Sequence, residues 1–390
     1  MAYSEREAKA LIIKAGHRLV KEGLVARTWG NISARISDTQ FVITPSGLGY
    51  DTMQPEDLVT VNVEDCSWEG DRKPSSEKGI HADVYRLRPE VCFVIHTHQE
   101  KASVFGIAGE DLQTEGKASL LGSVVPCADY GLSSTKKLRR AVAAQVAAAQ
   151  VARAVLMRNH GALCMGEDCG QAFLAAKELE QLCGKEMRNR FREWEAAGDE
   201  TKDRQKACPG EVLKLGKSMR KGNYFCHLLN GKRKIYDLRA LPAGISPAAA
   251  LHASIYKSSA ARYIAQESSP VVMEVCCQEE RLMPYLDDLA QIAGTSIRFS
   301  NLREAAKALK GRNAVFIQGG GALCTGQRAD DVAAVKTILR KGCAAQLFAK
   351  VQNDLWKAAG DEKYCCPLDG RDAALQRMVY KKKYSRKMRT

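Results

Sequence analysis

The chain of 390 residues repeats blocks of its own sequence, and this repeat constrains its fold more than any other feature. The stretch 153–166, with Asn-His-Gly-Ala-Leu-Cys at its centre, matches the stretch 313–326, with Gly-Gly-Gly-Ala-Leu-Cys. Each copy precedes a helical segment that ends in a Trp-x-Ala-Ala-Gly-Asp-Glu block, at 194–200 and at 356–362. Several matching blocks in one order are typical of a duplicated domain. The sequence therefore predicts a tandem duplication, with domains at residues 1–210 and 211–390.

Helical and strand patterns alternate along the first half. Helices are predicted near residues 4–23, 78–87, 135–149 and 169–197, and short apolar strands at 41–44, 58–63, 91–98 and 154–159. This alternation predicts an α/β domain with helices on the faces of a sheet, a three-layer α/β/α arrangement. The connectivity of the strands remains open.

Composition narrows the classes of function. The sequence contains no apolar signal segment and no apolar run of about 18 residues, so we expect a cytoplasmic chain without a membrane span. The 14 cysteines form no Cys-x-x-Cys pair and are expected to be reduced thiols. The net charge of +14 is partly concentrated at 381–389, and no nucleic-acid-binding motif accompanies it. A solvated tail and anionic, phosphate-bearing small molecules are the favoured interpretation, with no specific nucleic acid as partner.

One cluster of residues predicts a metal site. His96 and His98 end an apolar run, and residues two apart in a strand point to the same face, so both imidazoles lie together. A second apolar strand leads to His160, and Glu77 offers a carboxylate upstream. Open catalytic zinc sites use three protein ligands and a water molecule. The alternative is that each histidine is an ordinary structural or surface residue.

The second copy provides an internal comparison for this cluster. Aligned on the repeated blocks, His160 falls on Gly320, and ungapped extension from His81 and His252 gives three further pairs: Glu77 on Ala248, His96 on Glu267, and His98 on Ser269. The second copy therefore lacks the proposed ligand set, and we predict one metal site per chain, in the first half.

Three short segments combine glycine with hydroxyl and amide side chains: 27–33, 43–47 and 75–76. Backbone N–H groups at glycine turns and at helix N-termini suit a phosphate dianion. Taken one at a time, the alternative is ordinary turn chemistry.

The order of these motifs resembles the class II aldolase/adducin family. The motifs are Gly-Asn-x-Ser, Thr-Pro-Ser-Gly, Ser-Ser-Glu before a helical His, His-x-His, Val-Pro-Cys-Ala-x-Tyr and Asn-His-Gly, over about residues 5–195. Within the family, the chain is most similar to members that cleave L-fuculose 1-phosphate. The second half resembles the same domain in a degenerate form, much as adducin-type members keep the fold without metal ligands.

The resemblance implies a role for each matching residue. His96, His98 and His160 would bind Zn²⁺ or another divalent metal. Glu77 would ligate the resting metal and then act as acid/base, and Tyr130 would protonate the aldehyde oxygen. The substrate phosphate would be held by Thr28, Gly30, Asn31, Ser46, Gly47, Ser75 and Ser76.

The implied activity is that of a zinc-dependent aldolase. It would cleave a small ketose 1-phosphate to dihydroxyacetone phosphate and an aldehyde through a metal-stabilised enediolate. The same scaffold also serves sugar-phosphate dehydratases and 4-epimerases; the epimerases generally carry Asp where this chain has Glu77, which favours the aldolase. A non-catalytic, adducin-like interaction protein is the alternative from another class. Because family aldolases form tetramers, the resemblance also implies a homo-oligomer.

Overall fold

The computed structural model describes residues 2–25, 29–114, 120–197, 211–278 and 281–386, and the chain divides into two compact units. The first unit comprises Met1–Ala196 and Phe348–Cys366, and the second comprises Ala197–Leu347 and Pro367–Thr390. The second stretch of the first unit holds the end of the long helix α10 (Ala329–Ala358) and the segment after it. The units thus differ in this respect from the predicted division after residue 210.

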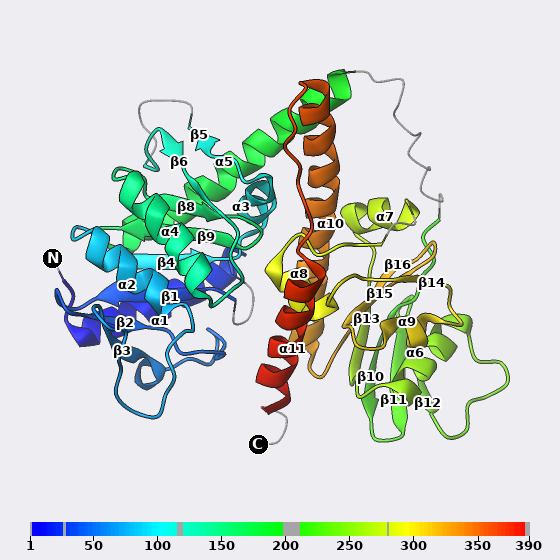
Figure 1. Cartoon of the computed structure of the whole chain (residues 1–390). Coiled ribbons are helices and arrows are strands. Elements are labelled where there is room, and N and C mark those ends of the chain that lie inside the picture. Colours follow the sequence, from blue (N-terminus) through cyan, green and yellow to red (C-terminus); the bar gives the residue numbers. More distant parts are fainter. Residues whose placement is uncertain (1, 26–28, 115–119, 198–210, 279–280, 387–390) are drawn as a thin grey trace. The chain divides into compact units, whose positions relative to one another are not determined.

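The first unit is built on a seven-stranded sheet (Figure 1). Its strands, in spatial order, are β3 (Val59–Asn62), β2 (Gln40–Ile43), β1 (Asn31–Arg35), β4 (Phe93–Thr97), β9 (Gly161–Gly166), β8 (Ala154–Met157) and β7 (Cys127–Ala128). Neighbouring strands are antiparallel except for β7 and β8, which are parallel. A separate two-stranded ribbon pairs β5 (Leu112–Gln113) with β6 (Val124–Val125).

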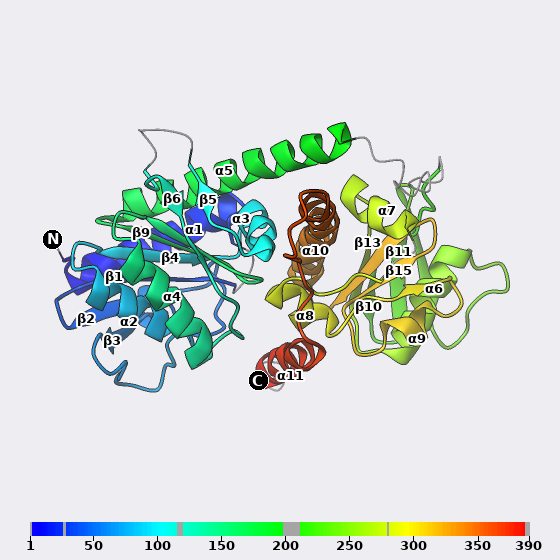
Figure 2. The ribbon, with the colours of Figure 1, turned by 45° about the horizontal axis from the view of Figure 1, so that its top comes forward.

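Helices cover both faces of this sheet (Figure 2). One face carries α2 (Lys78–Leu87) and α4 (Lys136–Ala148), and the other carries α1 (Glu5–Lys21), α3 (Glu100–Phe105) and α5 (Cys169–Ala196). Short 3₁₀ turns lie at Pro55–Asp57 and Gly106–Ala108. Because the sheet is covered on both faces, β4, β8 and β9 are buried along their whole length, which explains their continuous apolar runs. The predicted three-layer α/β fold class is confirmed.

Local sequence signals fix where the helices begin. The Ser4 hydroxyl accepts a hydrogen bond from the Glu7 amide at 3.3 Å and caps α1, which has Glu5 and Glu7 in its first turn. The Thr135 hydroxyl caps α4 in the same way, with the Leu138 amide as donor at 3.3 Å. This second cap matters for the site, because it orients the segment just before α4.

The second unit has its own seven-stranded sheet. Its strands, in spatial order, are β12 (Lys232–Asp237), β11 (Tyr224–Leu229), β10 (Lys217–Lys221), β13 (Tyr263–Glu267), β16 (Gly321–Gly326), β15 (Ala314–Ile317) and β14 (Phe299–Ser300). Its helices are α6 (Pro247–Ser258), α7 (Pro270–Cys277), α8 (Asp287–Ala293), α9 (Ala305–Leu309), most of α10, and α11 (Gly370–Arg386). The strand order and the single parallel pair match the first sheet position by position. This agreement supports the duplication inferred from the sequence.

Three strands of the first sheet were missed in the sequence: β1, β9 and the two-residue strand β7. β1 begins inside the segment 27–33, which was interpreted as a loop, and β9 begins at the glycine that follows His160. Twelve described cysteines are free thiols, as expected, whereas Cys277 is disulfide-bonded. Among the described residues, no helix is both long enough and apolar enough to cross a membrane.

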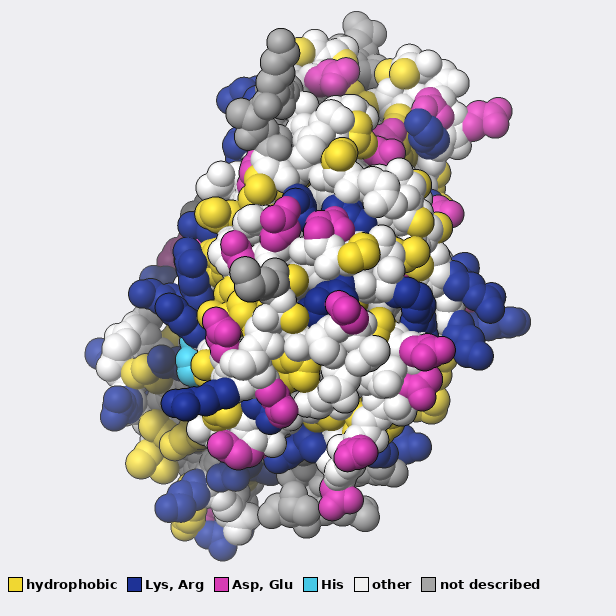
Figure 3. All heavy atoms as spheres, turned by 90° about the vertical axis from the view of Figure 1, so that its left-hand side faces the viewer, with side chains coloured by type: hydrophobic (Ala, Val, Ile, Leu, Met, Phe, Trp, Pro, Cys, Tyr) yellow, Lys and Arg dark blue, Asp and Glu magenta, His cyan; other side chains and the backbone are white. Residues whose placement is uncertain are grey.

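The surface of the chain carries charges of both signs. On the face drawn in Figure 3, basic and acidic side chains are interspersed. The interpretation of the net charge of +14 as a preference for small anionic ligands stays a prediction.

Candidate metal centre

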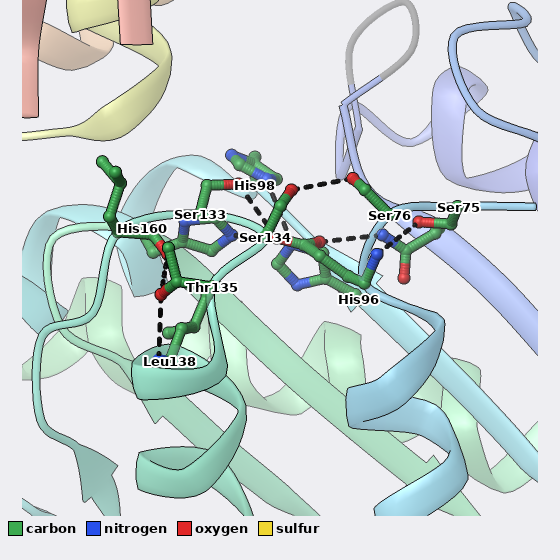
Figure 4. A network of polar contacts seen from close by, with 12 residues as sticks. Ser75, Ser76, His96, His98, Ser133, Ser134, Thr135, Leu138 and His160 are labelled. Carbon is green, nitrogen blue, oxygen red and sulfur yellow. Dashed lines mark hydrogen bonds and ion pairs between the residues drawn. The ribbon is translucent and has the colours of Figure 1, made fainter. Parts of the chain in front are cut away.

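Three imidazoles converge at one end of the first sheet. His96 lies near the end of β4, opposite Leu163 of β9, so the turn that carries His160 lies beside the end of β4. The Nε2 atom of His96 lies 3.1 Å from Nε2 of His98 and 3.1 Å from Nε2 of His160. One ring nitrogen from each of the three residues lies within 4.8 Å of the others. The structure therefore brings the three predicted ligands together (Figure 4).

Two glycines allow this close packing. Gly30 has φ +88°, and a Cβ atom there would lie 2.5 Å from the carbonyl oxygen of His96. A Cβ atom on Gly161 would lie 2.2 Å from the carbonyl oxygen of Thr97. Only glycine permits backbones to approach so closely. Gly30, predicted to bind phosphate, thus has a structural role beside the histidine cluster.

Glu77 completes the cluster from the N-terminal end of α2. Its Oε2 lies 3.4 Å from Nε2 of His96, and its Oε1 lies 3.4 Å from Nε2 of His160. The side-chain amide of Asn31 donates to Oε2 at 3.0 Å, and the hydroxyl of Ser133 donates to Oε1 at 3.0 Å. The carboxylate is therefore buried, held from two sides and directed at the histidines.

The protonation states favour a cation. Burial would raise the pKa of Glu77, but the interactions with the neighbouring rings of His96 and His160 outweigh it and hold the pKa well below its usual value. Nδ1 of His96 lies 2.9 Å from the carbonyl oxygen of Ala162, which can only accept, so Nδ1 carries the proton and Nε2 keeps its lone pair for the cluster. Three imidazole nitrogens and one carboxylate are a donor set that suits zinc. The residues present fit a divalent metal.

The predicted phosphate loops lie next to each other. Pro45 and Pro74 form an isolated β-bridge, the Ser46 amide donates to the Lys73 carbonyl at 2.9 Å, and the Ser75 amide donates to the Thr44 carbonyl at 3.0 Å. The Ser75 hydroxyl also accepts from the Glu77 amide at 3.3 Å.

The individual phosphate candidates have different environments. Ser46 and Ser76 are exposed, whereas Gly47, with φ +77°, and Ser75 are buried. Asn31 joins the same region through Glu77, and Thr28 lies outside the described residues. Their role in holding phosphate stays a prediction.

The segment just before α4 was missed in the sequence. Ser133 contacts Glu77, and the Ser134 hydroxyl donates to the Ser76 hydroxyl at 2.8 Å (Figure 4). A pocket of about 160 Å³ opens here between the N-terminal ends of α2 and α4, and Lys78, Lys136 and Arg139 are among its lining residues. The Ser-Ser-Thr triplet could have been recognised as a helix start, but only the packing of α4 beside α2 brings it to Glu77.

Tyr130 lies two residues after β7 and is half-buried. The ammonium of Lys137 lies 5.9 Å from its ring centroid. Its role as proton donor stays a prediction.

The second unit has no equivalent ligand set. The register places Gln266, opposite Leu323 of β16, at the position of His96, and Gly320 at the position of His160. The ungapped alignment that paired His96 with Glu267 is therefore wrong by one residue, because the spacing between helix and strand differs between the copies. Gln266 donates to the Gly320 carbonyl at 2.8 Å and accepts from the Leu215 amide at 2.8 Å. At the corresponding place in the second unit, a side chain thus connects two backbone segments by hydrogen bonds.

Comparisons with known proteins relate the first half of the chain to other sequences and structures. The model of the class II aldolase and adducin N-terminal domain matches residues 10–186. The chain is 35% identical over 171 residues to 5-deoxy-D-ribulose 1-phosphate aldolase of Bacillus thuringiensis serovar kurstaki, covering 43% of this chain and 79% of that protein. It is 29% identical over 202 residues to methylthioribulose-1-phosphate dehydratase of Serratia proteamaculans, covering 49% of this chain and 98% of that protein.

Among solved structures, L-fuculose 1-phosphate aldolase matches with 30% identity and a TM-score of 0.43, over 51% of this chain and 90% of that chain. The resemblance found in the sequence is confirmed, and the chain belongs to the class II aldolase and adducin family.

Proposed function

We propose that the first unit is a divalent-metal-dependent aldolase that cleaves a small ketose 1-phosphate to dihydroxyacetone phosphate and an aldehyde. The observation that carries this proposal is the convergence of three imidazole nitrogens on the buried carboxylate of Glu77. The name of the Bacillus relative supports a 5-deoxyketopentose 1-phosphate as the first substrate to test.

The residues of the site have separate roles in metal binding and in proton transfer. A divalent cation held by His96, His98 and His160 would supply Lewis-acid stabilisation of the negative charge that develops on the ketose oxygen. Nδ1–H of His96 donates to Ala162 and thereby orients the ring. In the condensation direction, Glu77 takes the proton from the carbon next to the carbonyl, and Tyr130 gives a proton to the aldehyde oxygen. In the cleavage direction, deprotonated Tyr130 takes the proton from the hydroxyl whose oxygen becomes the aldehyde oxygen, and protonated Glu77 returns its proton to the carbon next to the carbonyl.

Phosphate binding fixes the other end of the substrate. Ser75 and Ser76 directly precede Glu77 in the chain, and the loop of Ser46 is bridged to theirs, so all three offer neutral donors near Glu77. Binding energy from a remote phosphate holds the reacting carbons at the metal and so lowers the entropic part of the barrier.

A dehydratase is the second candidate, because the Serratia relative, which the match covers almost completely, is named for that reaction. Both reactions need a metal and a base next to a carbonyl, so the site geometry alone favours neither. The products differ: the aldolase breaks a carbon–carbon bond and forms dihydroxyacetone phosphate, whereas the dehydratase removes water and leaves the carbon chain of the substrate intact.

The test combines metal analysis with product analysis. Purified protein should contain one zinc or other divalent ion per chain and should form dihydroxyacetone phosphate from 5-deoxyribulose 1-phosphate or fuculose 1-phosphate. Glu77→Gln should abolish turnover. Glu180→Gln is the matched control, because Glu180 accepts from the Lys101 and Ala102 amides at 2.8 and 3.1 Å, away from the histidines. Full activity in Glu77→Gln, or no bound metal in the wild type, would contradict the proposal.

The second unit is proposed to be a non-catalytic copy. Gln266 and Gly320 replace two of the histidines, and neither glycine nor a fully hydrogen-bonded amide replaces an imidazole ligand. The expected homo-oligomer stays a prediction, which light scattering of the full chain would test.

A further inference from the structure

A line of hydrogen bonds connects the core of the first unit to Glu77. The Tyr85 hydroxyl lies 2.7 Å from the Ser33 hydroxyl, which lies 2.7 Å from Nδ1 of His81. Nε2 of His81 contacts Oδ1 of Asn31, and Nδ2 of Asn31 donates to Oε2 of Glu77 at 3.0 Å. All five side chains are buried. Tyr85, Ser33 and His81 have no role in the site as described above.

Chemistry fixes the direction of this line. An ionised carboxylate only accepts, so Asn31 must turn its NH₂ group toward Glu77 and its oxygen toward His81. The amide oxygen also only accepts, so Nε2 of His81 must carry the ring proton, and Nδ1 accepts from the Ser33 hydroxyl. Burial, with a smaller contribution from His96, lowers the pKa of His81 to about 3, so the ring is neutral at pH 7. A single tautomer satisfies every contact.

The second unit contains the same trio without the connection to a site. Ser218 lies 2.6 Å from Nδ1 of His252 and 2.7 Å from the Tyr256 hydroxyl. Two residues before Ser218, where the first unit has Asn31, stands Gly216. Among the described residues, no side chain accepts a hydrogen bond from Nε2 of His252. The Ser–His–Tyr trio therefore belongs to the fold, and the His–Asn–Glu connection is particular to the metal centre.

We propose that His81 is a positioning residue, whose Nε2–H holds the Asn31 amide in the orientation that donates to Glu77. Without this donor the amide can rotate and turn its oxygen toward the carboxylate, which weakens the support of Glu77 and moves it from the histidines. The inference rests on the proposed function only in assigning Glu77 to the metal and to proton transfer.

Matched substitutions separate positioning from folding. His81→Leu keeps an apolar side chain of similar size and removes the donor, and His252→Leu makes the same change in the second unit. Loss of an outer partner of a metal site typically costs about 10–100-fold in metal affinity or activity. We expect losses of this size in zinc affinity and kcat for His81→Leu, none for His252→Leu, and partial recovery in His81→Gln, whose amide can donate to Asn31.

A second pair of variants tests the same connection with a smaller change, in case His81→Leu fails to fold. Ser33→Ala removes the hydroxyl that donates to Nδ1 of His81 and so releases the tautomer, whereas Ser218→Ala is its control. We expect Ser33→Ala to lower zinc affinity and kcat and Ser218→Ala to change neither, at comparable melting temperatures. Wild-type affinity and kcat in both His81→Leu and Ser33→Ala, or equal losses in the controls, would overturn the proposal.

A metal-free measurement keeps this inference distinct from the proposed function. In ¹⁵N-histidine NMR spectra of the metal-free protein at pH 7, His81 should be neutral with its proton on Nε2. A proton on Nδ1, or a charged ring, would overturn the positioning role. Failure of the wild type to bind zinc or to cleave a ketose 1-phosphate would instead reject the proposed function, whatever the tautomer.

Discussion

The buried histidine of the second unit should make folding sensitive to acid. Burial, with a contribution from His227, lowers the pKa of His252 from 6.5 to about 3. The His227 ring lies 4.7 Å away between centroids, and the Arg220 guanidinium lies 5.5 Å from the Tyr256 ring. Below pH 6.5 the unfolded chain takes up a proton that the folded unit excludes, so stability falls as the pH falls from 6.5 toward 3.

The size of the effect follows from the shift. One pKa unit corresponds to about 1.4 kcal/mol, so the step of 1.5 units from pH 6.5 to 5.0 costs the folded state about 2 kcal/mol. In His252→Gln this titration is absent. The free energy of unfolding of the wild type, relative to that of the variant, should therefore fall by about 2 kcal/mol between pH 7 and pH 5.

Two optical probes allow the second unit to be followed separately. All four tryptophans, Trp29, Trp68, Trp194 and Trp356, belong to the first unit. In urea titrations, tryptophan fluorescence therefore reports the first unit, and far-UV circular dichroism reports both. Only the transition absent from the fluorescence signal should respond to His252→Gln. Parallel pH curves for wild type and variant in that transition would refute the reasoning, and a change in the fluorescence transition would show that the substitution acts elsewhere.

Three further predictions concern the first unit. Gly30→Ala should lower the free energy of unfolding by more than the ~1–2 kcal/mol that a left-handed alanine costs, because its Cβ would also meet the His96 carbonyl. Gly23→Ala is the control: Gly23 has φ +74° and nothing lies within 4 Å of its Cβ, so thermal unfolding of this variant should show only the cost of the left-handed backbone. His160→Ala should abolish stoichiometric zinc binding in metal analysis, whereas His227→Ala in the second unit should leave it intact, and retained zinc in the first variant would remove His160 from the ligand set. The Glu110 carboxylate accepts hydrogen bonds from Arg190 at 2.9 Å, Trp356 at 3.2 Å and Lys363 at 3.3 Å. Glu110→Gln should therefore speed tryptic cleavage after Lys363. An unchanged cleavage rate would show that these contacts do not hold the segment 359–366.

The parts of the fold that sequence patterns predicted are those buried by apolar side chains. β4 and β8 were recognised because both of their faces are covered and their sequences are continuously apolar. β1 was missed because it buries Ser33 and Arg35, whose polar groups bond Tyr85, His81 and the carbonyl oxygen of Val91. A buried strand with polar side chains becomes recognisable only when its tertiary partners are known.

The site shows the same limit. His96 and His98 were found because a two-residue spacing in a strand is a local signal. Ser133 was missed because its distance from Glu77 depends on two helices, α2 and α4, that are separated by about fifty residues of chain. The line from Tyr85 to Glu77 could not be seen in the sequence for a related reason, since it passes twice from α2 to β1 and back.

The two copies separate what the fold requires from what the chemistry requires. Both keep a Ser–His–Tyr trio, between β1 and α2 in the first unit and between β10 and α6 in the second, so the trio packs the same interface with or without a metal site. Where the first unit has His96, the second has Gln266, whose amide satisfies the backbone of Leu215 and Gly320. A buried site that loses its ligands would leave polar groups unpaired, at about 1–3 kcal/mol each. A glutamine at this position pairs the backbone groups of Leu215 and Gly320 and so removes that cost.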